Sequence, residues 1–174
     1  YNIQQAIDEI TGVFVQTESL SDLLTVTANE LKHFVGAESV TITLTTKSAA
    51  QRVVFSTLPD HLEVGAPVLT QAHMLASKQK VLAVEDLGET QATLADELSK
   101  VGVAMVSQLH SPTELVGYVL FGYKQNGSSY TAHDIEFVDI VSDEFSIAIQ
   151  NMQRFQEIAN FNNELQKKIT DATA

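Results

Sequence analysis

Residues 102–137 read GVAMVSQLHSPTELVGYVLFGYKQNGSSYTAHDIEF and hold two apolar runs, a polar turn and a helix start. The runs cover residues 103–109 and 115–123, and both are rich in the apolar side chains that favour strands. A Ser-Pro-Thr turn lies between them, so the pair is expected to form a hairpin. Gly117 interrupts the second run, which indicates that a neighbouring element approaches its backbone closely.

A long helix is predicted to follow this hairpin. Thr131 is a suitable N-cap, and Asp134 and Glu136 lie in the first turn, where the helix dipole favours carboxylates. No proline or glycine occurs from Thr131 onward. A helix from Thr131 to Ile169 would be about 58 Å long, which is more than a small core needs.

The chain ahead of this hairpin alternates between helices and strand pairs. Ile3, Ile7, Ile10 and Phe14 recur at steps of three and four, which predicts an amphipathic helix. The order of elements indicates an α+β fold with one antiparallel sheet of about five to six strands. The expected helices are 3–14, 22–35, 70–78, 93–101 and the helix from 131, and the expected strands are 39–45, 51–58, 81–84, 103–109 and 115–123, with a loop at 59–67.

Composition excludes several classes of function. The formal charge of −12 argues against a nucleic-acid role, because a phosphate backbone would be repelled. The chain has no cysteine, which excludes disulfides, thiolate nucleophiles, Cys-ligated zinc and a thioether-linked chromophore. The histidines show no metal-ligand spacing, no catalytic constellation is visible, and no apolar run is long enough to cross a membrane. We therefore expect a cytoplasmic, non-enzymatic domain without a metal site or membrane contact.

The last helix carries an apolar pattern that continues past the expected domain. Phe155, Ile158, Asn162, Leu165 and Ile169 follow the a/d spacing of a coiled coil, in which an a-position asparagine favours a parallel pair. An apolar stripe on a projecting helix needs a partner. We therefore expect a parallel homodimer through the first and last helices. The residues expected at this interface are Ile3, Ile7, Ile10, Phe14, Phe155, Ile158, Asn162, Leu165 and Ile169.

These patterns divide the chain into three parts. Residues 1–18 are expected to form an N-terminal signalling helix, 19–150 the core domain, and 151–174 a coiled-coil linker. The chain starts at Tyr1 rather than Met, and its last residues are still compatible with a helix. We therefore expect the segment to belong to a longer polypeptide that carries an output domain.

Short motifs in the second half of the chain occur in a familiar order. They are AVEDL at 83–87, GVAMV at 102–106, ELVGYVL at 114–120, YTAHDIEF at 130–137 and AIQN at 148–151. In order and spacing they resemble a GAF domain, the small-molecule sensory module of many bacterial signalling proteins, over about residues 19–151. The resemblance implies a GAF/PAS-like sheet with terminal helices on one face and short helices and loops over a ligand pocket on the other. It also implies a sensor in a two-component protein such as a histidine kinase, which binds a small molecule and relays the change to an output domain.

Departures from the family pattern leave the ligand open. The Asn-Lys…Phe…Asp-Glu signature of cyclic-nucleotide-binding members is missing, and the lack of cysteine excludes covalent bilin attachment within this chain and methionine sulfoxide reduction. One alternative is a ligand-free structural dimerisation module. Another is a haem-binding gas or redox sensor that uses His73 or His110. A cavity lined by mixed polar and apolar groups would favour sensing over the structural module.

The resemblance also suggests where a ligand would bind. Val40, Ile42 and Leu44 suit the helix-packed face of a strand, which leaves the alternating threonines toward the pocket. Apolar and hydroxyl-bearing residues of the other strands and the middle helix complete the expected lining. The expected ligand-binding residues are Thr41, Thr43, Phe55, Met74, Met105, Ser107, Leu109 and Tyr118.

Overall fold

The computed structural model describes residues 1–57 and 80–173. The predicted loop at 59–67, the predicted helix at 70–78 and the candidate residues Met74 and His73 lie outside the described residues. In chain order the described elements are α1 (Ile3–Gln16), α2 (Leu20–Val35), β1 (Val40–Thr45), β2 (Gln51–Ser56), β3 (Val81–Ala83), η2 (Val84–Asp86), η3 (Glu89–Gln91), α5 (Ala92–Lys100), β4 (Met105–His110), β5 (Leu115–Phe121) and α6 (Ala132–Thr173).

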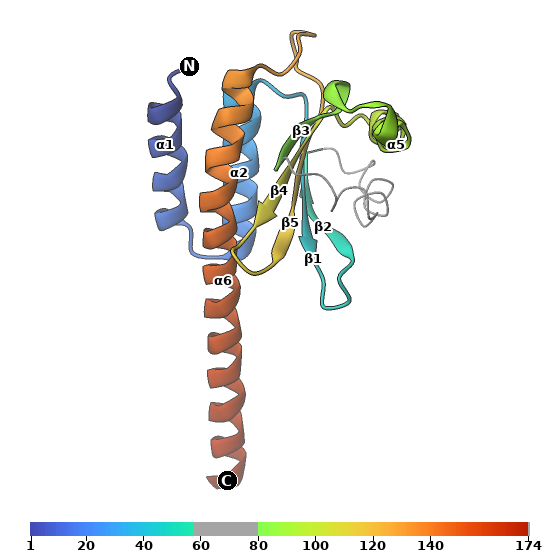
Figure 1. Ribbon diagram of the computed structural model, residues 1–174. Helices are drawn as coiled ribbons and strands as arrows, with labels where there is room; N and C mark the ends of the chain where they lie inside the picture. The colour runs from blue at the N-terminus through green and yellow to red at the C-terminus, as the bar shows by residue number, and fades with distance from the viewer. Residues whose placement is uncertain (58–79, 174) are drawn as a thin grey trace.

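The described strands form one antiparallel sheet in the order β2-β1-β5-β4-β3, which confirms the predicted α+β architecture. β1 and β5 pair along their length, with Val40 opposite Phe121 and Leu44 opposite Gly117. Figure 1 shows α1, α2 and α6 together on one face of the sheet and α5 on the other. The terminal helices therefore form a layer of their own, as the GAF resemblance implies.

Local sequence signals set the ends of the helices. Ser19 caps α2 by accepting a hydrogen bond from the backbone N–H of Asp22 at 3.1 Å. Gly36 ends the same helix at φ 69°, a left-handed conformation that glycine adopts without steric cost. At the start of α6, the side chains of Thr131 and Asp134 accept hydrogen bonds from each other's backbone N–H groups at 3.1 and 2.9 Å. The cap predicted at Thr131 is confirmed.

Two apolar clusters lie on opposite faces of the sheet. The larger cluster fills the space under α1, α2 and α6, and its members Ile42, Phe121 and Phe145 have no exposed surface. The smaller cluster lies under α5, where Leu94 and Leu98 pack on strand residues. β4 and β5 are therefore apolar on both faces, which explains why their sequences show little alternation.

The apolar stripe of α1 is largely used inside this chain. Ile10 has no exposed surface, and Ile3, Ile7 and Phe14 pack against the same core. The rings of Phe14 and Phe145 are stacked with their centres 5.8 Å apart. This corrects the predicted dimerisation role of Ile10, which cannot reach a second chain. The other three residues direct part of their surface to the core, because α1 lies against α6 of its own chain.

α6 is much longer than the domain it supports. Its 42 residues correspond to about 63 Å. The first half covers the sheet through Phe137, Val141 and Phe145, and the second half projects away from the domain (Figure 1). None of the described helices combines the length and hydropathy that crossing a membrane requires.

Candidate functional site: a cleft beside the start of helix α6

The sheet register places three of the predicted ligand residues on the face away from α6. Residues opposite each other on neighbouring antiparallel strands share a face. Thr43 is opposite Tyr118 and Thr41 is opposite Leu120. Tyr118 and Leu120 belong to the cluster under α5, so all four side chains lie on that side. This is the face expected for Thr41, Thr43 and Tyr118, and their contact with a ligand stays a prediction.

Four other predicted ligand residues lie on the helix face, so their expected role is corrected. Met105 and Leu109 are fully buried beneath the helices, and Phe55 packs against the same core. Ser107 faces α6, where its hydroxyl oxygen lies 2.6 Å from that of Ser142. These side chains hold the sheet and helices together and do not face the pocket side.

The register of β4 identifies the residues that the sequence interpretation missed. Val106 is opposite Leu120 and Gln108 is opposite Tyr118, so these two residues share the face under α5. The run at 103–106 is apolar throughout, and its side-chain alternation cannot be read from the sequence. The polar character of Gln108 is the signal that could have set the register correctly.

Tyr118 has a buried hydroxyl that the described residues do not satisfy. The residue has no exposed surface, and no described residue forms a hydrogen bond with its hydroxyl. Burial raises the pKa of Tyr118 to about 12, so it is a neutral phenol at physiological pH. Nearby, Thr43 donates to Gln51 Oε1 at 2.9 Å, and Gln51 Nε2 donates to Thr45 at 2.8 Å. Thr43 and Gln51 are therefore already hydrogen-bonded. Among the described residues, the Tyr118 hydroxyl is the group left to donate a hydrogen bond to a ligand on this face.

A cleft of about 660 Å³ lies beside the sheet, and sequence reasoning did not anticipate it. One wall comes from η2, η3 and α5, and the other from the segment after β5 at 123–130. Its volume is in the range of small-molecule sites. Of the residues predicted to bind a ligand, none that the structure describes lines this cleft.

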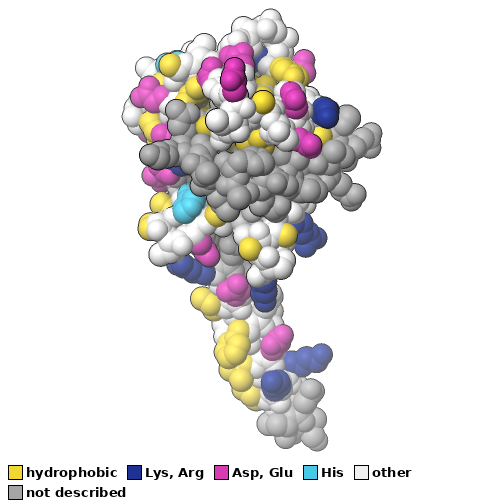
Figure 2. Space-filling model, turned by 45° about the vertical axis from the view of Figure 1, so that its right-hand side comes forward, with side chains coloured by type: hydrophobic (Ala, Val, Ile, Leu, Met, Phe, Trp, Pro, Cys, Tyr) yellow, Lys and Arg dark blue, Asp and Glu magenta, His cyan; other side chains and the backbone are white. Residues whose placement is uncertain are grey.

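The cleft combines apolar surface with carboxylates. Its lining includes the apolar residues Val84, Leu87 and Val103 and the acidic residues Glu85, Glu89 and Asp96. Ser129 donates across the cleft to Glu85 Oε2 at 3.0 Å. Figure 2 shows acidic side chains gathered at the upper end of the domain, with apolar side chains between them. Such a mixed lining suits a small molecule with both apolar and polar parts.

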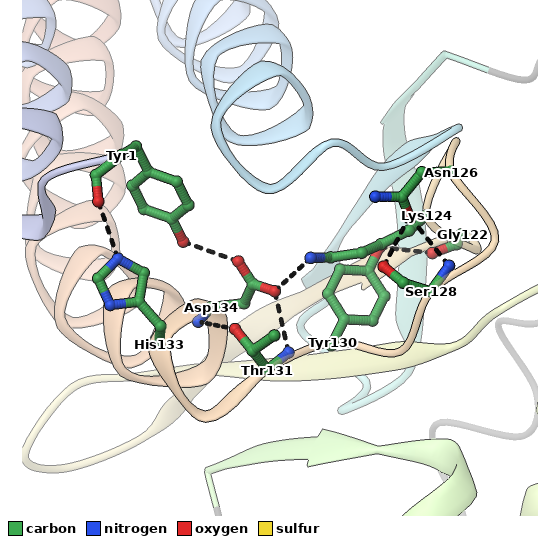
Figure 3. Close-up of polar contacts among 9 residues, drawn as sticks. All are labelled: Tyr1, Gly122, Lys124, Asn126, Ser128, Tyr130, Thr131, His133 and Asp134. Atoms are coloured by element: carbon green, nitrogen blue, oxygen red, sulfur yellow. Dashed lines mark hydrogen bonds and ion pairs between the residues drawn. The ribbon is translucent and has the colours of Figure 1, made fainter.

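The cleft borders the residues that hold the first turn of α6 (Figure 3). Lys124 and Tyr130 both line it. Lys124 Nζ lies 2.6 Å from Asp134 Oδ2 and 5.6 Å from the centre of the Tyr130 ring. The Tyr130 hydroxyl donates to the carbonyl of Gly122 at 2.6 Å. One side chain, Lys124, thus connects the wall of the cleft to α6.

Asp134 is the centre of this polar network. Its side chain is 3% exposed, and Oδ1 accepts a hydrogen bond from the Tyr1 hydroxyl at 2.9 Å. Oδ2 accepts from the backbone N–H of Thr131 at 2.9 Å and pairs with Lys124. Burial raises the pKa of Asp134, but hydrogen bonds from Lys124, Thr131 and Tyr1 outweigh burial and hold the pKa below its ordinary value. The result is a buried carboxylate that stays charged and joins the segment before α1 to the start of α6.

The projecting half of α6 carries an uncovered apolar stripe. Phe155, Ile158, Leu165 and Ile169 are between 47% and 66% exposed, and Asn162 lies among them. Figure 2 shows apolar side chains gathered along one side of the helix below the domain. The apolar side chains at the predicted coiled-coil positions are therefore largely exposed to solvent in the single chain.

A groove continues this stripe toward the domain. Its volume is about 1020 Å³, and it lies between α1 and α6. Val15 of α1 and Ile147 and Phe155 of α6 line it, and all three are at least half exposed. Exposed apolar residues thus occur both in this groove and on the projecting helix, and Phe155 belongs to both.

The structure places His110 away from both the cleft and the groove. The residue is exposed at the end of β4, and its Nδ1 lies 2.6 Å from the carbonyl oxygen of Ser111. Residues 1–57 and 80–173 hold no cluster of three or more metal-ligating side chains.

Known proteins match this chain in structure only: no family model and no curated sequence matches it. The GAF domain of a cyanobacterial phytochrome, solved with phycoerythrobilin bound, has a TM-score of 0.64 at 20% identity over 90% of this chain and 98% of that one. The GAF domain of an Acinetobacter phosphoenolpyruvate-protein phosphotransferase has a TM-score of 0.66 at 12% identity over 88% of this chain and 96% of that one. This chain has the GAF-domain fold.

A third solved structure extends the comparison to two-component proteins. A domain of a putative two-component sensor histidine kinase from Sinorhizobium meliloti 1021 matches with a TM-score of 0.56 at 14% identity, over 79% of this chain and 94% of that one. The GAF resemblance seen in the sequence motifs is therefore confirmed for the fold.

Proposed function

We propose that this GAF-fold chain is a sensory domain that binds a small molecule in the cleft and relays the change through α6. The observation that carries the proposal is the contact between the cleft and the helix: Lys124 lines the cleft and is bound to Asp134 in the first turn of α6. A ligand that moved this wall would act on the base of a helix about 63 Å long.

The relay requires no chemistry in the domain itself. We propose a non-enzymatic, cytoplasmic role in which α6 acts on an output domain of the same polypeptide, such as a histidine kinase. The fold shared with a sensor histidine kinase domain supports this choice. The projecting half of α6, in which residues 160–170 are all exposed, supports it too.

Ligand binding in the cleft is tested by filling it. Metabolites are screened against the wild-type chain by thermal shift, and the affinity of each stabilising compound is measured by calorimetry. Ala92→Trp places a large side chain on the cleft wall, so the affinity should fall by about tenfold or more. Thr93→Trp is the matched control, because Thr93 is the exposed neighbour that does not line the cleft, and its affinity should match wild type.

A third variant distinguishes binding in the cleft from binding at the sheet face under α5. If the compound sits against the sheet, Tyr118→Phe removes a donor and weakens binding, whereas Ala92→Trp leaves it unchanged. That outcome would move the proposed site to the residues around Thr43. If no compound binds and none co-purifies in native mass spectrometry, the chain is better described as a structural dimerisation module.

The relay is also proposed to need a parallel homodimer through α6 and the outer surface of α1. The support is the series of exposed apolar residues from Val15 and Ile147 to Ile169, because an exposed apolar stripe of this length is costly in water. Asn162 within the stripe favours a parallel pair in register.

Charge on the stripe should separate the two chains. Leu165→Glu combined with Ile169→Glu places four carboxylates in one seam, so light scattering should give the monomer mass while circular dichroism still shows a folded domain. The control is Asn160→Glu with Asn163→Glu, which adds the same charge on the outer face of the helix and should stay dimeric. A wild-type chain that remains monomeric at high concentration contradicts the dimer.

A further inference from the structure

Polar contacts tie α6 to the sheet layer at several levels. They join Asp134 to Lys124, Asp139 and Asp143 to Lys80, Ser142 to Ser107, and Gln150 to Glu114. Within residues 1–57 and 80–173, each of the ion pairs that the structure shows joins a lysine next to a strand to an aspartate of α6. Ion pairs therefore attach α6 to the sheet layer at two separate points, at Asp134 and at Asp139 with Asp143.

Lys80 makes the outer of these two attachments. Its Nζ lies 2.6 Å from Asp139 Oδ1 and 2.5 Å from Asp143 Oδ1, and it donates to the Asp139 carbonyl at 2.8 Å. The two aspartates are four residues apart, so they lie on one face of the helix. A single ammonium group thus bridges two successive turns of α6.

The two attachments differ in their exposure to solvent. The Lys124 and Asp134 side chains are 12% and 3% exposed. Those of Lys80, Asp139 and Asp143 are 22%, 51% and 61% exposed. Exposed ion pairs are weak and screened by salt, whereas a buried pair is costly to open. The outer attachment can therefore open while the inner one stays closed.

Lys80 is also connected to the cleft through the backbone. Its carbonyl accepts a hydrogen bond from the N–H of Gln108, which places it at the start of the edge strand β3. β3 has three residues and continues directly into η2, where Val84 and Glu85 line the cleft. A shift of η2 along the strand would thus move the residue that holds α6.

We propose that Lys80 is a releasable clamp that sets the angle of α6 against the sheet. When the clamp opens, α6 tilts by a few degrees about the buried Lys124–Asp134 pair, and the core residues Phe137 and Phe145 shift with it. Glu164 lies 30 residues beyond Asp134, or about 45 Å along the helix, so a tilt of about 5° moves it by about 4 Å, whereas Phe145 moves by only about 1.4 Å. The significance of this motion for signalling rests on the proposed relay function, but the clamp is a property of the chain itself and is tested without a ligand.

The absence of cysteine makes the pivot directly measurable. Arg52→Cys on β2 and Glu164→Cys on α6 place spin labels at two exposed positions, and an excess of unlabelled chain restricts the measured distances to one chain. Lys80→Met should shift or broaden the distance distribution by several ångströms in double electron–electron resonance. Asp139→Asn with Asp143→Asn should do the same, and 1 M salt should produce the change in the otherwise unsubstituted labelled chain.

Two controls and two outcomes define the test. Lys80→Arg keeps the charge and should keep the wild-type distribution, and so should Lys47→Met in the β1–β2 turn. The same distribution in Lys80→Met as in wild type at low salt would overturn the clamp, and so would a change as large in Lys47→Met. Ligand affinity and dimer mass are measured separately on the same variants, so failure of the clamp is distinguishable from failure of the sensory role.

Discussion

Replacing Gly117 by alanine should destabilise the domain by about 4 kcal/mol or more, or prevent it from folding. An added Cβ would lie 1.9 Å from the Thr43 carbonyl oxygen and 2.9 Å from the Thr43 carbonyl carbon. The Leu44 Cα would lie 3.0 Å away. All three atoms are backbone, so no side-chain rotation relieves the overlap and β1 would have to move away from β5. Urea unfolding followed by circular dichroism measures the loss.

Gly12→Ala is the matched control for this prediction. Gly12 lies within α1, and an added Cβ there has no atom within 4 Å. Because alanine favours the helix over glycine, this variant should gain about 0.5–1 kcal/mol. The same chemical change should therefore have opposite signs at the two positions. A Gly117→Ala protein as stable as wild type would mean that β1 and β5 do not approach each other as closely as described.

The close approach at Gly117 is one of the features that the sequence did predict. A glycine in the middle of a strong strand, a Thr131 cap with a carboxylate three residues later, and a helix that never meets a proline are all local signals. They depend on neighbouring residues alone, and the structure confirms them. The element order and the single antiparallel sheet followed from such signals taken together.

Local signals do not predict which face of the sheet a side chain occupies or which distant residues it contacts. Met105 and Val106 are both apolar and both buried, so the sequence does not say which of them faces the helices. The apolar stripe on α1 has the same spacing whether it covers its own core or another chain. In the structure, Ile10 is buried in the core of its own chain. The packing of α6 against the sheet determines which residue of β4 faces the helices and what the α1 stripe covers.

The candidate site depends even more on long-range contacts. The cleft is assembled from η2, η3, α5 and the segment after β5, none of which carries a binding motif of its own. Lys80 and Asp143 are 63 residues apart, and nothing in either neighbourhood marks them as partners. Sequence reasoning therefore reached the family fold, but it assigned Met105, Ser107 and Leu109 of β4 to the pocket side, whereas these residues face the helices.

Lys124→Met should cost about 3–5 kcal/mol of stability at pH 7. The substitution keeps most of the apolar stem of Lys124 but removes the ammonium that pairs with Asp134 at 2.6 Å. The Tyr1 hydroxyl and the Thr131 N–H still donate to the carboxylate, but its charge would be buried without a counter-ion. Urea unfolding gives the change in the free energy of unfolding. A loss below about 1 kcal/mol would mean that solvent reaches Asp134.

The dependence on pH distinguishes a lost counter-ion from lost packing. In the wild type the pKa of Asp134 lies below its ordinary value of 3.8, so its stabilising contribution is present above that pH and is lost as the pH falls through the folded value. In Lys124→Met, burial is opposed by fewer hydrogen bonds, so the pKa of Asp134 should rise. The variant then protonates Asp134 at a higher pH, and the cost of the substitution should shrink between pH 7 and pH 4. Adding Asp134→Asn should recover part of the loss at pH 7, because no charge remains to be buried. A cost that is the same at both pH values would assign the effect to packing around Tyr130 rather than to the ion pair that joins the cleft to α6.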